Sequence, residues 1–309
     1  VDVRGRGDAQ LQNAGFAPPP RGRQPQVWVM SPSDEGFWLW NVTLHGACKT
    51  YDYPESSKIV QDGKGGVWAL CKTSGSSSWM LWHADDAHEA RTYSYPHSSH
   101  IASDGIGGIW VLCDTCEERA WVLWHANMDR ELKKWKYPAT SKIVGDGKGG
   151  VWILCLTGET HKLWHADLKR EVMLYEYPLD SKMVGDGRGG VWVICSTKGC
   201  NAQWKLWHAN LDREIEKWAY PSDSRIQGDS QGGVWVLCRT DSGHHLWHAD
   251  LRREVQCCKC PAHAGMVADG HGGLWTLCDG QLQHVTLDKA SNVHQFPNRA
   301  KLVLEHVQA

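Results

Sequence analysis

The sequence has no excess of charge of either sign and no long apolar run. Its 309 residues include 33 Lys and Arg against 35 Asp and Glu, so the net charge is −2. Without a basic excess the chain has no field that attracts polyanions, and we do not expect nucleic acid among its partners. No stretch is apolar for long enough to be a transmembrane segment, and no signal-peptide pattern is present. We therefore expect a soluble protein.

A Trp that recurs at a nearly constant spacing is the main positive signal. The spacing is 40 to 43 residues, and the positions are Trp28, Trp68, Trp110, Trp152, Trp192, Trp235 and Trp275. Six of the seven follow two glycines and an aliphatic residue, which indicates a tight turn that leads into a strand. A repeat that fills nearly the whole chain predicts one closed domain.

Each repeat contains four β-rich stretches separated by turn residues. In the fourth unit these stretches are 141–146, 151–155, 162–167 and 172–178, which we designate strands A to D. Asp146-Gly147 supplies the first turn, because Gly accepts positive φ and Asp bonds to the turn backbone. The expected fold is all-β: a seven-bladed β-propeller with four antiparallel strands in each blade.

The two ends of the chain predict how the ring closes. The first unit begins at strand B, Val27-Trp-Val-Met30, and no strand A precedes it. Residues 300–305 match the strand A pattern, so the C-terminal strand is expected to complete blade one. The propeller then spans residues 27–309. Residues 1–26 lie outside the repeat, contain few large apolar side chains, and are expected to form a tail or arm.

His and Asp recur in the repeat as regularly as Trp. The strand C residues are His83, His125, His165, His208, His248 and His284, and the turn residues are Asp62, Asp104, Asp146, Asp186, Asp229 and Asp269. Because equivalent residues of different blades lie apart, we interpret the His as bonding a neighbouring turn through such a carboxylate, rather than as a metal ligand. The recurring Trp is interpreted as a spacer packed between blades.

Six of the twelve Cys also share one repeat position. They are Cys71, Cys113, Cys155, Cys195, Cys238 and Cys278. A residue that recurs inside a strand is more simply a small buried hydrophobe than half of a disulfide, which favours a reducing intracellular compartment while leaving secretion open. Cys113-x-x-Cys116 has no second ligand pair at zinc-site spacing, and we predict no metal or other cofactor.

These motifs resemble two kinds of propeller repeat. The run from Ser141 to Trp152, followed by Leu163-Trp-His165 and by endings such as Trp218-Ala-Tyr220, resembles tectonin-type repeats. It is also similar to the repeats of streptogramin lyases and two-component regulators. The first resemblance implies a lectin or a membrane-associated recognition protein. The second implies an enzyme that uses a His and a metal, but its catalytic residues match no particular positions here, because His recurs in nearly every blade.

Recognition is expected where the repeat varies. The B to C loops differ between blades, and they share one face of the disc with the D to A crossings. An aromatic set precedes the strand C Trp on this face: Phe37, Trp79, Trp121, His161, Trp204 and His244, with Gly280 in blade seven. A cationic set opens strand A around the expected channel mouth: Lys58, His100, Lys142, Lys182, Arg225 and Lys301, with Gly265 in blade seven. Each set also has a structural explanation. The aromatic residues can pack the loops against their blades, and the cationic residues can be solvated charges at the rim.

We therefore predict a non-enzymatic, lectin-like module that binds a glycan or another polar or anionic ligand on the face with the B to C loops. The first alternative is a protein interaction scaffold, and the second is a lyase-type enzyme. Blade six departs from the pattern, with Cys257-Cys-Lys-Cys260 in strand D and with His244, His245 and His263 close in sequence. A metal or redox role is one interpretation of this blade, and a relaxed outer strand is the other.

Overall fold

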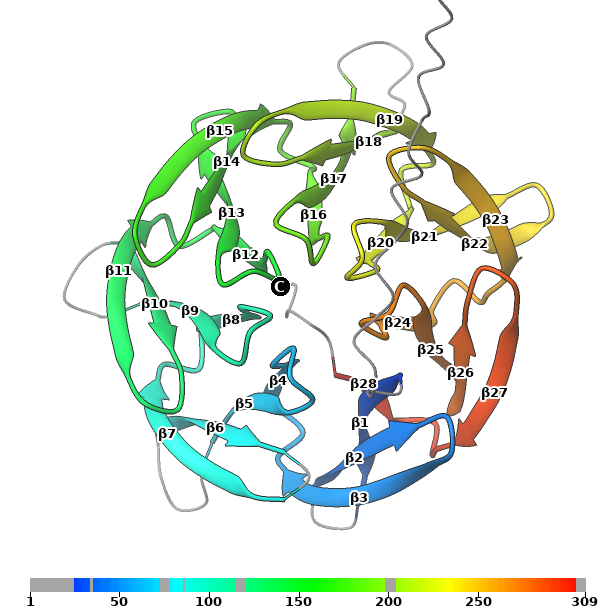
Figure 1. Cartoon of the computed structure of the whole chain (residues 1–309), viewed down its shortest axis with the longest axis horizontal. Helices are drawn as coiled ribbons and strands as arrows, with labels where there is room; N and C mark the ends of the chain where they lie inside the picture. The colour runs from blue at the N-terminus through cyan, green and yellow to red at the C-terminus, as the bar shows by residue number, and fades with distance from the viewer. Residues whose placement is uncertain are drawn as a thin grey trace, which may run out of the picture.

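The chain folds into a ring of seven four-stranded antiparallel sheets (Figure 1). The computed structural model describes residues 25–33, 36–72, 78–85, 87–114, 120–197 and 204–303. These residues form β-strands and connecting turns, and none of them belongs to a helix long and apolar enough to cross a membrane. The predicted all-β, seven-bladed propeller is confirmed.

The first four blades are described here from strand A to strand D, and in blade one the C-terminal β28 takes the place of strand A. Blade one contains β28 (Lys301–Leu302), β1 (Gln26–Pro32), β2 (Phe37–Thr43) and β3 (Gly46–Tyr53). Blade two contains β4 (Lys58–Gln61), β5 (Val67–Lys72), β6 (Trp79–Ala84) and β7 (Glu89–Tyr95). Blade three contains β8 (His100–Ser103), β9 (Ile109–Asp114), β10 (Trp121–Ala126) and β11 (Glu131–Tyr137). Blade four contains β12 (Lys142–Gly145), β13 (Val151–Thr157), β14 (Thr160–Ala166) and β15 (Glu171–Tyr177).

The remaining three blades have the same order. Blade five contains β16 (Lys182–Gly185), β17 (Val191–Ser196), β18 (Trp204–Ala209) and β19 (Glu214–Tyr220). Blade six contains β20 (Arg225–Gly228), β21 (Val234–Thr240), β22 (Gly243–Ala249) and β23 (Glu254–Lys259). Blade seven contains β24 (Gly265–Ala268), β25 (Leu274–Cys278), β26 (Gln281–Val285) and β27 (Ala290–Gln295).

Burial changes from the centre of the ring to its rim. Strand B, such as β13, is buried on both faces because a blade packs against each of them. Strand D, such as β15, is the outermost strand of its blade and is exposed or half-buried until it ends at the buried Tyr177. Figure 1 shows these outer strands wrapping around the rim while the short A strands surround the axis. The core is therefore divided into clusters between successive blades.

The recurring Trp fills these clusters, as predicted. All seven are fully buried, and Trp152 of blade four packs with Met183 and Val191 of blade five. An indole carries more apolar surface than any other side chain, so one position per blade supplies much of each contact. The Trp repeat is thus the spacing element of the ring.

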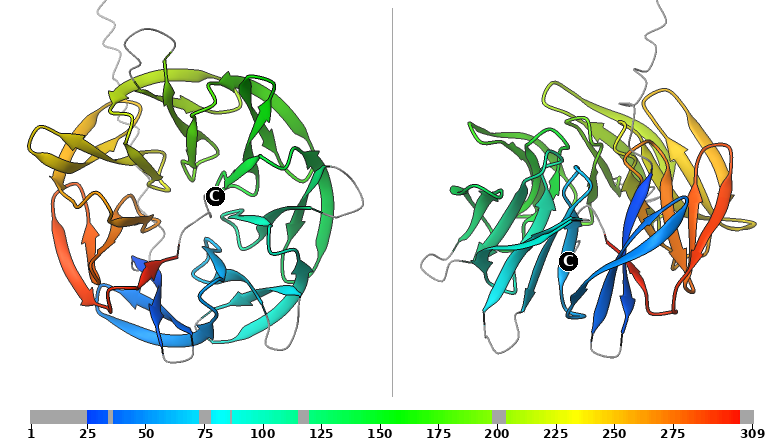
Figure 2. Two further views of the ribbon diagram at one scale, coloured as in Figure 1. Left: turned by 180° about the vertical axis from the view of Figure 1, so that it is seen from behind. Right: turned by 60° about the horizontal axis from the view of Figure 1, so that its bottom comes forward.

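The C-terminal strand completes blade one, which confirms the predicted closure. Strand β28 pairs with β1 through Val29–Leu302 and Met30–Lys301, and the amide of Val303 donates to the carbonyl of Trp28 at 2.9 Å. Figure 2 shows this red strand beside the blue β1. Strand β1 begins at Gln26. Most of the expected N-terminal arm, residues 1–24, and the end of the chain from 304 lie outside the described residues.

Antiparallel order places two kinds of connection on two faces. The A to B and C to D turns lie on one face, here called the turn face. The B to C loops and the D to A crossings lie on the other, here called the loop face. Parts of three predicted recognition loops, 73–77, 115–119 and 198–203, lie outside the described residues.

Candidate functional site

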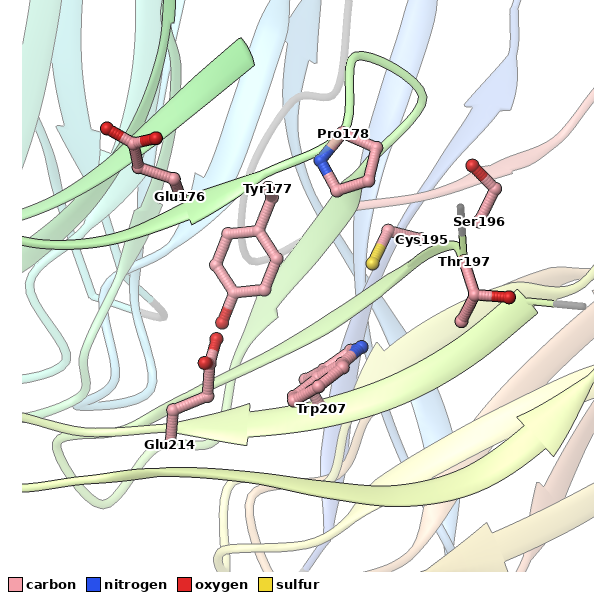
Figure 3. A pocket seen from close by; sticks show the side chains of 8 residues that line it. All are labelled: Glu176, Tyr177, Pro178, Cys195, Ser196, Thr197, Trp207 and Glu214. Atoms are coloured by element: carbon pink, nitrogen blue, oxygen red, sulfur yellow. The ribbon is translucent and has the colours of Figure 1, made fainter. Parts of the chain in front are cut away.

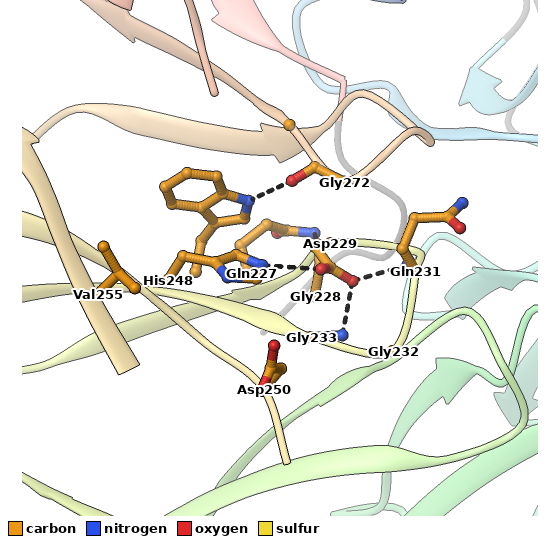
Figure 4. A network of polar contacts seen from close by, with 12 residues as sticks. Gln227, Gly228, Asp229, Gln231, Gly232, Gly233, His248, Asp250, Val255 and Gly272 are labelled. Atoms are coloured by element: carbon orange, nitrogen blue, oxygen red, sulfur yellow. Dashed lines mark hydrogen bonds and ion pairs between the residues drawn. The ribbon is translucent and has the colours of Figure 1, made fainter. Parts of the chain in front are cut away.

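A repeated polar network holds the turn face together (Figure 4). In blade six, His248 Nε2 lies 2.9 Å from Asp229 Oδ2, and Asp229 Oδ1 accepts from the amides of Gln231 and Gly233 at 2.7 and 2.8 Å. Trp235 Nε1 then donates to the carbonyl of Gly272 in blade seven at 3.2 Å. The equivalent His–Asp pairs are His83–Asp62, His125–Asp104, His165–Asp146, His208–Asp186 and His284–Asp269. The predicted structural role of these His and Asp residues is confirmed.

In blade two the Asp62 carboxylate is stabilised in its ionised form. Burial alone raises the pKa of Asp62, but the hydrogen bond with His83 and the amides of Lys64 and Gly66 outweigh it and lower that pKa. Blades are also joined through backbone, since the amide of Gly149 donates to the carbonyl of Asp104 at 2.9 Å. These residues are engaged in the contacts that hold the turn face together.

A large cavity opens on the turn face, at the other end of the ring from the predicted recognition residues. Its volume is about 1730 Å³, and turn glycines such as Gly63, Gly105 and Gly147 line it together with Lys64 and Arg188. The A to B turns converge here because strand A is the innermost strand of every blade. Turns that look like uniform scaffold in the sequence therefore also enclose the central cavity.

Exposed aliphatic side chains lie on the turn face. Ile106 of an A to B turn is 51 % exposed. The C to D turns present further exposed aliphatic side chains: Leu44, Met128, Leu211 and Leu287. Of these residues, Leu287 lines the cavity.

A smaller pocket of about 220 Å³ lies at the rim between blades four and five (Figure 3). The Tyr177 hydroxyl points toward the carboxylate of Glu214, and Cys195 and Trp207 complete the wall. Burial, followed by the hydrogen bond with Glu214, raises the pKa of Tyr177. Other blades repeat this pair, for example Tyr53 with Glu89, so we interpret the pocket as part of a blade-to-blade contact.

The predicted aromatic set divides into two groups. Phe37 and His161 are only 3 % and 7 % exposed, and His161 Nδ1 lies 3.2 Å from the carbonyl of Pro178. Their burial removes them from a surface on which a ligand can stack. Trp79, Trp121 and Trp204 are half-buried at the loop-face end of strand C, and His244 is also half-buried.

Three members of the predicted cationic set contact the next blade. Lys58 Nζ donates to the carbonyl of Ser99 at 2.7 Å, and Lys182 Nζ donates to that of Ser224 at 3.3 Å. Arg225 donates to the carbonyls of Ala262 and Ala264 at 3.1 and 2.7 Å. Burial lowers the pKa of Lys58. These three residues therefore join blades in addition to carrying charge at the rim.

The other three members of the cationic set differ in charge and surroundings. Burial, with Lys58 and Lys142 nearby, lowers the pKa of His100 and favours the neutral imidazole. Lys142 is half-buried, and its charge also lowers the pKa of His161. Lys301 is exposed, and its Nζ lies 3.7 Å from Glu55.

The aromatic and cationic sets meet within individual blades. Lys182 Nζ lies 5.2 Å from the ring centroid of Trp204, and Lys301 Nζ lies 5.2 Å from that of Phe37. The rings of His100 and Trp121 are 5.3 Å apart. Blade seven has Gly265 and Gly280 at the two positions, so the pattern is interrupted there.

The repeat-position Cys residues behave as buried hydrophobes in five blades. Cys71, Cys113, Cys155, Cys195 and Cys238 are buried free thiols, whereas Cys278 is half-exposed. Cys116 and Cys200 lie outside the described residues. In blade six the three Cys of 257–260 pack in or against one apolar cluster, and His245 lies 2.9 Å from Thr240. His263 lies elsewhere, beside blade seven.

Comparison with known proteins supports the fold alone. No family model and no curated protein matches the sequence. Among solved structures, the β-propeller domain of the Trilobed protease from Pyrococcus furiosus superposes with a TM-score of 0.59 at 12% identity, covering 77% of this chain and 85% of that one. A putative 6-phosphogluconolactonase from Bacteroides uniformis gives 0.54 at 10% identity, covering 91% and 100%.

An acylaminoacyl peptidase gives a TM-score of 0.60 at 10% identity, covering 90% of this chain and 52% of that one. The chain thus spans about half of that peptidase. Likeness at such low identity defines the class as a β-propeller, without placing the chain among tectonin-type proteins or streptogramin lyases.

Proposed function

We propose that the protein is a non-enzymatic recognition module that binds a polar, anionic ligand, such as an acidic glycan, on the loop face. The proposal rests on the short distance between an aromatic ring and a cationic side chain. The clearest case is Trp204, whose ring centroid lies 5.2 Å from Lys182 Nζ. A half-buried indole offers a flat apolar surface for a sugar ring, and a neighbouring ammonium offers charge for its carboxylate or sulfate.

The structural contacts of the lysines are compatible with ligand binding. Lys182 Nζ gives one hydrogen bond to Ser224, and an ammonium carries three donors. The carbonyl contact fixes the side chain, so less conformational entropy is lost when a ligand binds. Trp79, Trp121 and Trp204, together with Lys58, Lys142, Lys182 and the exposed Lys301, form the proposed surface, with His100, Arg225 and His244 beside it.

A glycan array tests this proposal. Wild-type protein is expected to bind a subset of acidic glycans, and the Trp79→Ala, Trp121→Ala, Trp204→Ala triple variant is expected to lose at least about tenfold in affinity, or about 1.4 kcal/mol. Trp135→Ala is the matched control, because Trp135 is half-buried and donates to the Asp167 carbonyl on the turn face. Equal binding by wild type and a folded triple variant would contradict the proposal.

A protein interaction scaffold is the second candidate, and the turn face favours it. The cavity of about 1730 Å³ exceeds the usual volume of a small-molecule site, about 300–1,000 Å³, and exposed aliphatic residues lie on the same face. Such a surface suits an extended segment of a partner protein. Capture from native extract with wild type and with the Ile106→Ser, Met128→Ser, Leu211→Ser variant tests it. Partners lost by this variant but retained by the Trp triple variant would support the scaffold.

A further inference from the structure

Blade seven departs from the repeat at three adjacent points on the loop face. Ala264 stands where blades two to six have Ser57, Ser99, Ser141, Ser181 and Ser224. His263 directly precedes Ala264, and the B to C loop is reduced to the two-residue turn Asp279-Gly280. Both turn residues have positive φ, 49° for Asp279 and 77° for Gly280, so the hairpin is as tight as a two-residue loop allows.

These departures bring three potential metal ligands together. Cys278 Sγ lies 3.1 Å from His263 Nε2 and 3.4 Å from Asp279 Oδ2, and His263 Nε2 lies 3.3 Å from Asp279 Oδ1. One ligand atom from each residue lies within 4.8 Å of the others. Elsewhere in the ring the corresponding Cys is buried, for example Cys155 with Ser141 beside it. Among the residues that the structure describes, such a cluster occurs in blade seven alone.

The segments that carry the cluster are fixed by other contacts. Arg225 of blade six donates to the carbonyls of Ala262 and Ala264, which flank His263. The amide of Phe296 donates to the carbonyl of Gly280 at 2.7 Å and holds the hairpin turn. The backbone around the three side chains is therefore held in place before any ion arrives, which lowers the conformational cost of binding.

We propose that His263, Cys278 and Asp279 form a binding site for Zn²⁺. Imidazole nitrogen, thiolate sulfur and carboxylate oxygen are the ligand types that zinc prefers, and bond lengths of about 2.0–2.3 Å in a tetrahedron separate ligand atoms by about 3.5 Å. The observed separations of 3.1 to 3.4 Å are close to this value. Binding replaces the Cys278 S–H bond by an S–Zn bond and releases one proton to solvent.

The site leaves the fourth tetrahedral position open. The side chains of His263 and Asp279 are 67 % and 79 % exposed, so the metal faces solvent on the loop face. Water, or an anionic group of a ligand bound to that face, can complete the coordination, as in zinc sites with three protein ligands.

Zinc titration of the full chain, after chelator treatment and dialysis, tests the site. Competition with a fluorescent zinc indicator is expected to show one zinc per chain for wild type. Cys278→Ser and His263→Gln are each expected to weaken binding more than about 100-fold, because even outer partners of metal ligands contribute about 10- to 100-fold. Cys195→Ser is the matched control, since Cys195 has the same repeat position in blade five but is buried.

Cobalt substitution gives a second measurement that does not depend on affinity. The Co²⁺ complex of wild type and of Cys195→Ser is expected to show the ultraviolet charge-transfer absorption of a thiolate ligand, and Cys278→Ser is expected to lack it. Circular dichroism establishes that each variant is folded. The proposal is overturned if wild type takes up no zinc, or if Cys278→Ser and His263→Gln bind it as tightly as wild type. Loss of glycan binding alone would leave this site unaffected.

Discussion

The turn face and the loop face are built from the same repeat but differ in how far it is preserved. On the turn face, blades two to seven each place a His against an Asp in the same geometry, as in His165 and Asp146 at 2.8 Å. On the loop face the equivalent position of each blade holds Phe, Trp, His or Gly. Both faces carry contacts between blades, but those of the turn face repeat, such as the Gly149 amide to the Asp104 carbonyl, whereas those of the loop face differ from blade to blade. The residues that we propose for recognition therefore lie on the face that varies.

The largest expected difference concerns two Trp residues. Trp152→Ala removes a fully buried indole between blades four and five and should lower the free energy of unfolding by about 3–5 kcal/mol. Trp121→Ala, at the half-buried loop-face position, should cost clearly less. Chemical denaturation measures both. Equal losses would show that the loop-face aromatics are as much a part of the core as the repeated Trp.

A carboxylate on each face provides the next comparison. Asp146→Ala leaves the amides of Lys148 and Gly150 and the His165 ring without their acceptor, and should cost about 1–3 kcal/mol per buried group left unpaired. Asp180→Ala removes only a long contact with the Ser196 amide on the loop face, and should stay within about 0.5 kcal/mol. Thermal unfolding of both variants decides whether the networks stabilise the turn face.

Acid should weaken the turn face through Asp62, the equivalent carboxylate of blade two. The pKa of Asp62 is lower in the folded chain than in the unfolded chain, where it is about 3.9. Its stabilising contribution is therefore complete above the unfolded pKa and is lost as pH falls through the folded one. Between about pH 6 and about pH 3, wild type should lose more stability than Asp62→Asn. Parallel losses in the two proteins would contradict this assignment.

The smallest expected effect tests whether loop-face cations also join blades. Lys182→Met keeps the apolar stem but removes the donor to Ser224, and should cost about 0.5–1.5 kcal/mol. Lys142→Met is the control, because the described residues show no such hydrogen bond from Lys142 to the next blade. If neither substitution changes the free energy of unfolding, the hydrogen bond from Lys182 to Ser224 does not stabilise the contact between blades. Contacts that stabilise the ring would then differ more strongly between the two faces.

The fold could be predicted from the sequence because each repeat contains its own turn and strand signals. Turn residues, strand alternation and the spacing of Trp152 and its equivalents all follow from short stretches, and the late strand A at residue 301 could be recognised by its pattern. The His–Asp pairing was also predictable, since each pair lies within one blade. These features required no knowledge of how blades pack.

The site was less predictable because it depends on contacts between blades. Arg225 reaches Ala262 in the next blade, and Phe37 is covered by packing, and neither follows from sequence spacing. The turn-face cavity arises from the radius of the ring. The sequence did not indicate it, because the A to B turns that line it are nearly the same in every blade. Cys278 looked like the other repeat cysteines, and only the combination of Ala264 with a shortened Asp279-Gly280 loop indicates its exposure.

Strand β28 has a consequence for how the protein is made. Because Val29 pairs with Leu302, blade one remains incomplete until residue 302 has left the ribosome. Until then β1 presents an unpaired edge, and another chain can pair with it. Joining segments so distant in sequence is slow, so ring closure should be the last step of folding. The concentration of nascent chains during synthesis, rather than the final stability of the ring, should then govern its yield.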